Sequence, residues 1–318
     1  MKMIEAHGLV KKYGDFTAVK GLDLSVDNEI YGLLGPNGSG KTTTVNMFTT
    51  MLKITEGTAS VCGYDVEKNA QQVRECISYV PQDMAVDIRL TGRENVTLFA
   101  KLYGIRDRAE RKRRVEDALE VMNLADRADE RTKKYSGGMR RRLELAQALV
   151  HDPKVLFLDE PTVGLDVASR RSIWEYIVKL RDSGVTIFVT THQMDEAERY
   201  CDRVGILKKG NLTAEGRPYD LTAGMDSIIT VRTDGGIPSK IPDEVTAGEY
   251  KDGVATFTSP EGSTSLPGLI SCYGRENIKV FSSSVREPTL EDVYMLSVGP
   301  QEEGKFDDAQ FRNMMRRR

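Results

Sequence analysis

The sequence predicts an α/β fold in two parts: a large domain built on a parallel β-sheet, followed by a small α/β domain. Two buried-type strands, KVLFLDE at 154–160 and VTIFVTTH at 185–192, flank one helical segment, and this β-α-β order is typical of a parallel sheet. The chain has 318 residues. Because a single core rarely grows beyond about 250 residues, we expect two domains.

The first elements are expected to be two short strands and then a strand, a loop and a helix. β-Favouring runs on either side of Gly14 and Asp15 predict an antiparallel pair. From Ile30, the apolar run IYGLL predicts a strand, and TTTVNMFTTML predicts a helix. A glycine-rich loop therefore connects a sheet strand to the start of a helix.

Residues 90–150 are predicted to form an all-helical insert in this α/β core. Their apolar spacing is helical, and Thr91 and Glu94 have the spacing of a helix-capping box. A boundary is expected at 221–226, where Pro, Gly and polar residues precede a new pattern, so the first domain spans 1–222.

Residues 227–298 are expected to form the small α/β domain. SIITVRT, GVATFTS and NIKVFSS predict three short strands, and Thr289 with Asp292 could cap a final helix. The tail at 299–318 is charged and lacks strong periodicity, so we expect it to be mostly unstructured.

Composition excludes several classes of function. The longest apolar runs fall far short of the ~20 residues that cross a bilayer, and the first residues lack a secretory pattern, which predicts a cytoplasmic protein. A net charge of -3 provides no general attraction to nucleic acid. The four cysteines have no C-x-x-C spacing, which argues against a zinc site or a disulfide framework.

The loop GPNGSGKTT fits the phosphate-binding pattern G-x-x-x-x-G-K-[ST] through Gly35, Gly40, Lys41 and Thr42. Its backbone N–H groups and the following helix N-terminus favour phosphate oxygens. Lys41 should reach the β- and γ-phosphates, and the Thr42 hydroxyl should bind Mg²⁺. The loop therefore predicts binding of Mg-ATP or Mg-GTP.

Two further strand ends supply polar side chains for hydrolysis. Asp159 should hold the Mg²⁺ shell through water, and Glu160 should polarise the water that attacks the γ-phosphate. His192 follows the next strand, so a right-handed crossover would bring it to the same phosphates.

A second glycine-rich helix start, YSGGM, includes Ser136, Gly137 and Gly138. It is another phosphate-type site, but the first loop already serves the chain's own nucleotide. It therefore has either a different ligand or the nucleotide of a second molecule.

The ordered set Tyr13, GPNGSGKTT, Gln82, YSGGM, FLDEP, GLD and TTH resembles the ATP-binding subunit of ABC transporters over roughly the first 220 residues. The resemblance implies a P-loop ABC ATPase core with an N-terminal antiparallel β subdomain and a helical subdomain. It also implies a head-to-tail homodimer in which each YSGGM closes over the partner's ATP. The ATP-binding residues implied are Tyr13, Gly35, Pro36, Asn37, Gly38, Ser39, Gly40, Lys41, Thr42, Thr43, Ser136, Gly137, Gly138 and Asp166.

Individual roles follow from the same resemblance. Tyr13 would stack on adenine, Ser136 and Gly138 would contact the partner's γ-phosphate, and Asp166 would bridge the dimer interface. Gln82 would bind Mg²⁺ and would be a catalytic residue together with Glu160 and His192. It would also respond to the permease, the membrane protein that such a subunit drives. Tyr135, Met139 and Asn28 depart from the common pattern, but none removes a phosphate ligand.

The wording YSGGMRRRLELA and the later EPTLEDVYM resemble the daunorubicin-resistance branch of ABC-2-type drug exporters. This implies an ATPase that drives export of a drug, antibiotic or lipid-like molecule through a separate membrane permease, bound to the inner face of the membrane through that permease. The alternative is a soluble ABC ATPase acting on ribosomes or nucleic acid, but the sequence has one cassette and no sustained heptads. The small domain would support dimerisation or permease coupling, or would only pack.

Overall fold

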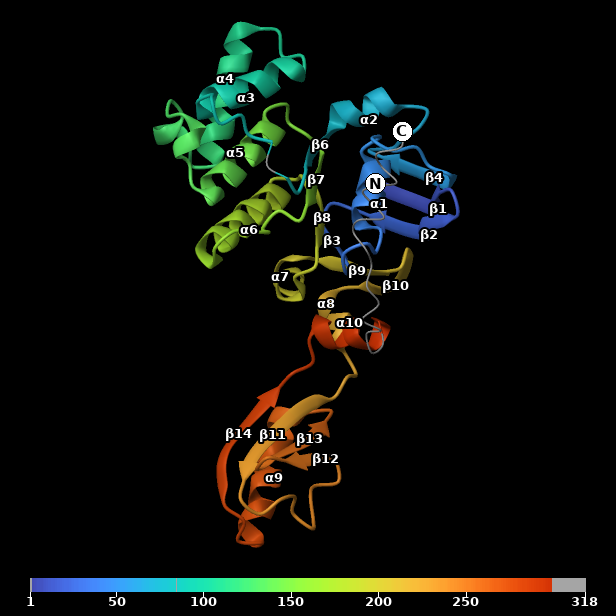
Figure 1. Ribbon diagram of the computed structural model, residues 1–318, viewed down its shortest axis with the longest axis vertical. Coiled ribbons are helices and arrows are strands. Elements are labelled where there is room, and N and C mark those ends of the chain that lie inside the picture. The colour runs from blue at the N-terminus through green and yellow to red at the C-terminus, as the bar shows by residue number, and fades with distance from the viewer. Residues whose placement is uncertain (1, 84, 299–318) are drawn as a thin grey trace.

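The computed structural model describes residues 2–83 and 85–298 (Figure 1). An upper body holds two sheets and a lobe of helices, and a lower body holds the small C-terminal sheet with one helix (Figure 1). Extended segments before β11 and after β14 join the two bodies (Figure 1).

The N-terminal sheet has the strand order β2-β1-β4-β5, and its neighbouring strands are antiparallel. The predicted pair around Gly14 is confirmed, since Tyr13 pairs with Phe16 across the turn. The strands are β1 (Ile4–Tyr13), β2 (Phe16–Val26), β4 (Glu56–Val61) and β5 (Tyr64–Asp65).

The central sheet has the order β10-β9-β3-β8-β7-β6, and it is parallel except for the edge pair β9 and β10. The predicted β-α-β unit is confirmed, because β7 and β8 are parallel neighbours joined by α6 (Val167–Asp182). The strands are β3 (Ile30–Leu34), β6 (Ile77–Val80), β7 (Val155–Asp159), β8 (Thr186–Thr191), β9 (Arg203–Lys208) and β10 (Asn211–Gly216).

Strands β3, β7 and β8 are buried along their whole length, which explains their continuous apolar runs. Their side chains alternate between two cores. One core takes Leu33, Phe157 and Phe188 together with α1 (Lys41–Phe48) and the N-terminal sheet. The other core contains the helical lobe, α6 and six residues of these strands: Ile30, Leu34, Leu156, Leu158, Ile187 and Val189.

The helical insert forms between β6 and β7, as predicted. Thr91 and Glu94 form the predicted capping box, in which each side chain accepts a hydrogen bond from the other residue's backbone N–H. The helices of this lobe are α3 (Gly92–Leu102), α4 (Arg108–Val121), η1 (Ala125–Arg127), η2 (Thr132–Lys134) and α5 (Gly137–Leu149), and α2 (Ala70–Cys76) precedes β6.

The small domain has an antiparallel sheet of order β12-β13-β11-β14 and the helix α9 (Gly262–Arg275). The three predicted strands are present, but β12 and α9 were not predicted. β12 is exposed at every position, so it has no alternating apolar pattern. In α9, Leu266, Leu269, Ile270 and Tyr273 have helical spacing, but Pro267 and several Gly and Ser residues disfavour a helix prediction. The strands are β11 (Ser227–Thr233), β12 (Thr246–Lys251), β13 (Val254–Ser259) and β14 (Val280–Arg286).

The last helix, α10 (Leu290–Val298), returns to the large domain and packs against α7 (Met194–Tyr200) and α8 (Pro218–Thr222) (Figure 1). Leu290 is fully buried in the core that contains the helical lobe. The predicted cap is present, since the Asp292 carboxylate accepts hydrogen bonds from the N–H and hydroxyl of Thr289. The boundary near residue 226 stays a prediction.

Candidate active site

The predicted ligands gather where parallel strands end on one edge of the central sheet. β8 lies between β3 and β7, with Thr191 opposite Leu34 and Thr190 opposite Asp159. The glycine loop, the Asp159–Glu160 turn and His192 therefore leave the sheet side by side. The carboxyl ends of parallel strands are the usual ligand-binding edge of such sheets.

The glycine loop is packed so closely that side chains are excluded at two of its positions. A Cβ on Gly40 would lie 2.6 Å from the Ala18 carbonyl oxygen, and one on Gly35 would collide with the carbonyl of Leu207. Gly40 also has φ of 110°, which L side chains rarely adopt. Among the residues that the structure describes, the Ser39 hydroxyl is buried without a hydrogen-bond partner. These features fit a backbone cradle for phosphate.

Lys41 begins α1 and is buried inside the loop. Its ammonium donates to the carbonyls of Gly35 at 2.8 Å and Pro36 at 3.2 Å, and lies 3.5 Å from Glu160 Oε1. Burial lowers the pKa of Lys41, while the carboxylates of Glu160 and Asp159 oppose that shift. The Lys41 ammonium therefore lies next to the carboxylate of Glu160, the proposed catalytic base.

Asp159 is buried between two threonine hydroxyls. Thr42 Oγ1 donates to Asp159 Oδ2 at 3.0 Å, and Thr190 Oγ1 donates to Oδ1. The hydroxyl and carboxylate oxygens are ligands of the kind that Mg²⁺ prefers. Sequence reasoning missed Thr190, although a polar residue in a buried strand beside the Asp159 strand was a usable signal.

Glu160 is held on three sides. Its Oε2 lies 3.0 Å from Nδ1 of His192, its Oε1 faces Lys41, and its backbone N–H donates to the Thr190 carbonyl at 3.0 Å. Its φ of 48° is unusual for a residue with a side chain, and such strain persists where the surroundings fix it. The contacts of the folded protein therefore fix the Glu160 backbone in a conformation that glutamate rarely adopts.

Ser136 and Asp166 cap two helices that begin side by side. Ser136 Oγ accepts the N–H of Met139 at 3.2 Å, and the Asp166 carboxylate accepts the N–H and hydroxyl of Ser169. A Cβ on Gly138 would collide with the Ser169 hydroxyl, so the helix starts are in close contact. In residues 2–83 and 85–298, no hydrogen bond or ion pair joins Ser136 or Asp166 to Lys41 or Glu160.

Gln82 and Tyr13 lie on elements that adjoin this edge. Gln82 is exposed and follows β6, whose Val80 pairs with Leu158 just before Asp159. Tyr13 ends β1, and Ala18 on the paired strand β2 touches the glycine loop. The roles assigned to Gln82 and Tyr13 stay predictions.

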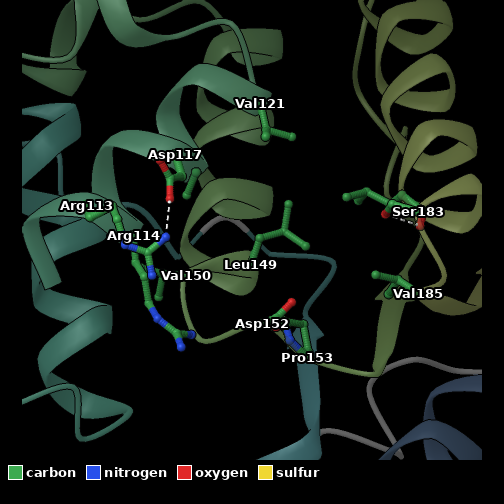
Figure 2. A pocket seen from close by; sticks show the side chains of 12 residues that line it. Arg113, Arg114, Asp117, Val121, Leu149, Val150, Asp152, Pro153, Ser183 and Val185 are labelled. Atoms are coloured by element: carbon green, nitrogen blue, oxygen red, sulfur yellow. Dashed lines mark hydrogen bonds and ion pairs between the residues drawn. The ribbon is translucent and has the colours of Figure 1, made fainter. Parts of the chain in front are cut away.

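A separate cavity of about 280 Å³ lies between α4 and residues 149–153 and 180–185 (Figure 2). Arg113 donates to Asp117 at its rim at 3.1 Å. None of its 12 lining residues is a predicted nucleotide ligand. This cavity is therefore separate from the candidate nucleotide site, which lies at the carboxyl ends of the parallel strands.

The structure contains no helix, within the part that it describes, that is both long and apolar enough to cross a membrane.

Comparisons with known proteins identify similar ATP-binding proteins. The sequence pattern of the ABC transporter family matches residues 19–163. Nod factor export ATP-binding protein I of Burkholderia orbicola is 38% identical over 93% of this chain and 97% of its own length. The daunorubicin/doxorubicin resistance ATP-binding protein of Streptomyces peucetius is 36% identical over 94% of this chain and 93% of its own length. The cassette MJ0796, solved as a dimer bound to ADP and Pi, is 28% identical with a TM-score of 0.60, covering 68% of this chain and 98% of its own.

Proposed function

Because the chain belongs to the ABC transporter family of ATP-binding subunits, we propose that it hydrolyses Mg-ATP to drive export of a small molecule through a separate membrane permease. The observation that carries this proposal is the position of Glu160. Its carboxylate lies between Lys41 of the glycine loop and His192, on the turn that also presents Asp159 to Thr42.

In the proposed reaction, the loop amides and Lys41 bind the ATP phosphates. Thr42, Asp159 and Gln82 would hold Mg²⁺, which neutralises charge on the phosphates when it is bound. Glu160 orients a water molecule and accepts its proton as the water oxygen attacks the γ-phosphorus. The bond to the bridging oxygen breaks, which leaves ADP and phosphate. His192 keeps the Glu160 carboxylate in position through its Nδ1 contact.

We propose a head-to-tail homodimer as the active form. Ser136 and Gly137 are exposed on a helix start that makes no hydrogen bond to the chain's own Lys41 within the described residues, which leaves them available to a second molecule. Asp166 is exposed beside them. In this arrangement Ser136 and Gly138 complete the partner's site, Asp166 lies at the interface and Tyr13 stacks on adenine.

The relatives named for Nod factor export and for daunorubicin/doxorubicin resistance support a small-molecule cargo such as a drug, antibiotic or lipid-like molecule. The permease would hold the chain at the inner face of the membrane.

The test is to search the neighbouring reading frames for a protein with several apolar segments of ~20 residues, reconstitute the full chain with that candidate permease, and measure Mg-ATP hydrolysis in proteoliposomes. We expect hydrolysis to be stimulated by the permease and by an exported drug. Stimulation by ribosomes or nucleic acid, with none by the permease, would contradict the exporter assignment.

A further inference from the structure

A buried ion pair on α5 lies behind the candidate site. Nη1 of Arg141 donates to Glu144 Oε2 at 2.8 Å, and the two side chains are 4% and 3% exposed. Burying two charges is costly unless the remaining donors and acceptors are also satisfied. Here they are satisfied by backbone groups of the candidate site.

The Arg141 guanidinium contacts three consecutive carbonyl oxygens of the turn that carries both functional carboxylates. Its Nε donates to Pro161 at 2.8 Å, and its Nη2 lies 3.3 Å from the Asp159 carbonyl and 3.5 Å from that of Glu160. A planar group with five fixed donors suits such an array better than the single ammonium of a lysine. Arg141 therefore fixes the backbone of this turn.

The same pair reaches the segment around Gln82. Nη1 of Arg141 donates to the Pro81 carbonyl at 2.9 Å, and Glu144 Oε1 accepts the N–H of Ala85 at 2.6 Å. Because α5 begins directly after Ser136, one ion pair joins the helix of the second glycine motif to the Gln82 segment and to the Glu160 turn.

We propose that Arg141 and Glu144 are positioning residues that hold Glu160 in its catalytic conformation; this inference rests on the proposed ATPase function. The strained φ of Glu160 requires surroundings that fix it. Arg141 contacts the carbonyl oxygen of Glu160 and those of its two neighbours, Asp159 and Pro161. Glu144 keeps Arg141 in place and neutralises it. Neither residue needs to touch nucleotide.

The experiment compares Glu144→Gln with the double variant Arg141→Met/Glu144→Gln in the full chain. The single variant leaves a buried unpaired cation and is the one at risk of misfolding, whereas the double variant removes both charges. We expect both to lower kcat for Mg-ATP about tenfold or more, while the Kd for ATP changes by less than about twofold.

A positional role predicts non-additivity with Glu160. In a Glu160→Gln background, measured by single-turnover hydrolysis, Glu144→Gln should lower the rate by less than about twofold, since the group that it positions is already gone. A loss that came only from lower stability would persist in that background. The shift in Tm caused by Glu144→Gln should be the same in both backgrounds.

Glu29→Gln is the matched control. It breaks a partly buried ion pair in which Arg203 Nη1 lies 3.0 Å from Glu29 Oε1. This pair lies at the end of the strands opposite to the candidate site. We expect it to lower Tm without changing kcat. The proposal is overturned if the double variant has the kcat of Glu29→Gln, or if Glu144→Gln loses rate equally in both backgrounds. Wild-type hydrolysis by Glu160→Gln would contradict the proposed role of Glu160, whereas absence of Mg-ATP hydrolysis by the wild-type chain would contradict the proposed function itself.

Discussion

Nδ1 of His192 lies 3.0 Å from Oε2 of Glu160, although 32 residues separate the two in sequence. The contact arises because β7 and β8 are parallel neighbours, so the residues that follow them emerge together. The carboxylate is almost fully buried, whereas the His192 side chain is 46% exposed. His192 is thus the solvent-facing member of the Glu160–His192 pair.

Replacing His192 with Ala should lower kcat by roughly tenfold or more and change ATP affinity less, because Glu160 loses the group that orients it. Steady-state hydrolysis and nucleotide binding by the purified chain measure the two effects. His7→Ala, an exposed change on β1, is the control. Equal rates for the two variants would remove His192 from the mechanism.

Asp159→Asn should weaken the response to Mg²⁺, because the Thr42 and Thr190 hydroxyls converge on this carboxylate. Hydrolysis titrated with Mg²⁺ should need a concentration about tenfold higher or more for half-maximal rate, and chelation with EDTA should abolish wild-type turnover. An unchanged Mg²⁺ titration by the variant would show that the metal is held elsewhere.

Mixing two inactive variants tests the composite site. A dimer of one Lys41→Ala chain and one Ser136→Arg chain retains one intact site if Ser136 acts on the partner's nucleotide. The mixture should therefore hydrolyse ATP when neither homodimer does. Should the mixture stay as inactive as its two components, Ser136 would act within its own chain or not at all.

The cap of α10 should respond to acid. Hydrogen bonding to Arg286 and Thr289 lowers the pKa of Asp292 to about 2 from 3.8. A depressed carboxyl pKa contributes stability that is present above pH 3.8 and is lost as the pH falls through about 2. Asp292→Asn should therefore cost about 1 kcal/mol or less near neutral pH, since the pair is partly exposed, and progressively less below pH 3.8. Urea unfolding at several pH values measures the difference, and a pH-independent cost would contradict this account.

Local spacing was enough to predict where the motif residues lie in the fold, while their roles stay predictions. Lys41, Thr42, Asp159 and Glu160 each sit at a strand end or helix start that their own neighbours indicate. The β-α-β topology predicted that His192 lies beside the phosphate-binding residues, and the structure adds its contact with Glu160.

Residues that act through tertiary packing were not predicted. Arg141 is the middle of three consecutive arginines, and only burial distinguishes it from its neighbours. The return of α10 to the large domain depends on an apolar surface formed by α7 and α8, which lie about 70 to 100 residues earlier in the chain.

The most direct test of the central claim is Mg-ATP hydrolysis by Glu160→Gln beside the wild-type chain, with ATP-dependent dimerisation followed on the same samples. The account predicts that the variant binds ATP normally, hydrolyses it at least about 10²-fold more slowly, and accumulates as an ATP-bound dimer. Near-normal hydrolysis by the folded variant, with its permease present, would contradict the claim that this carboxylate activates water.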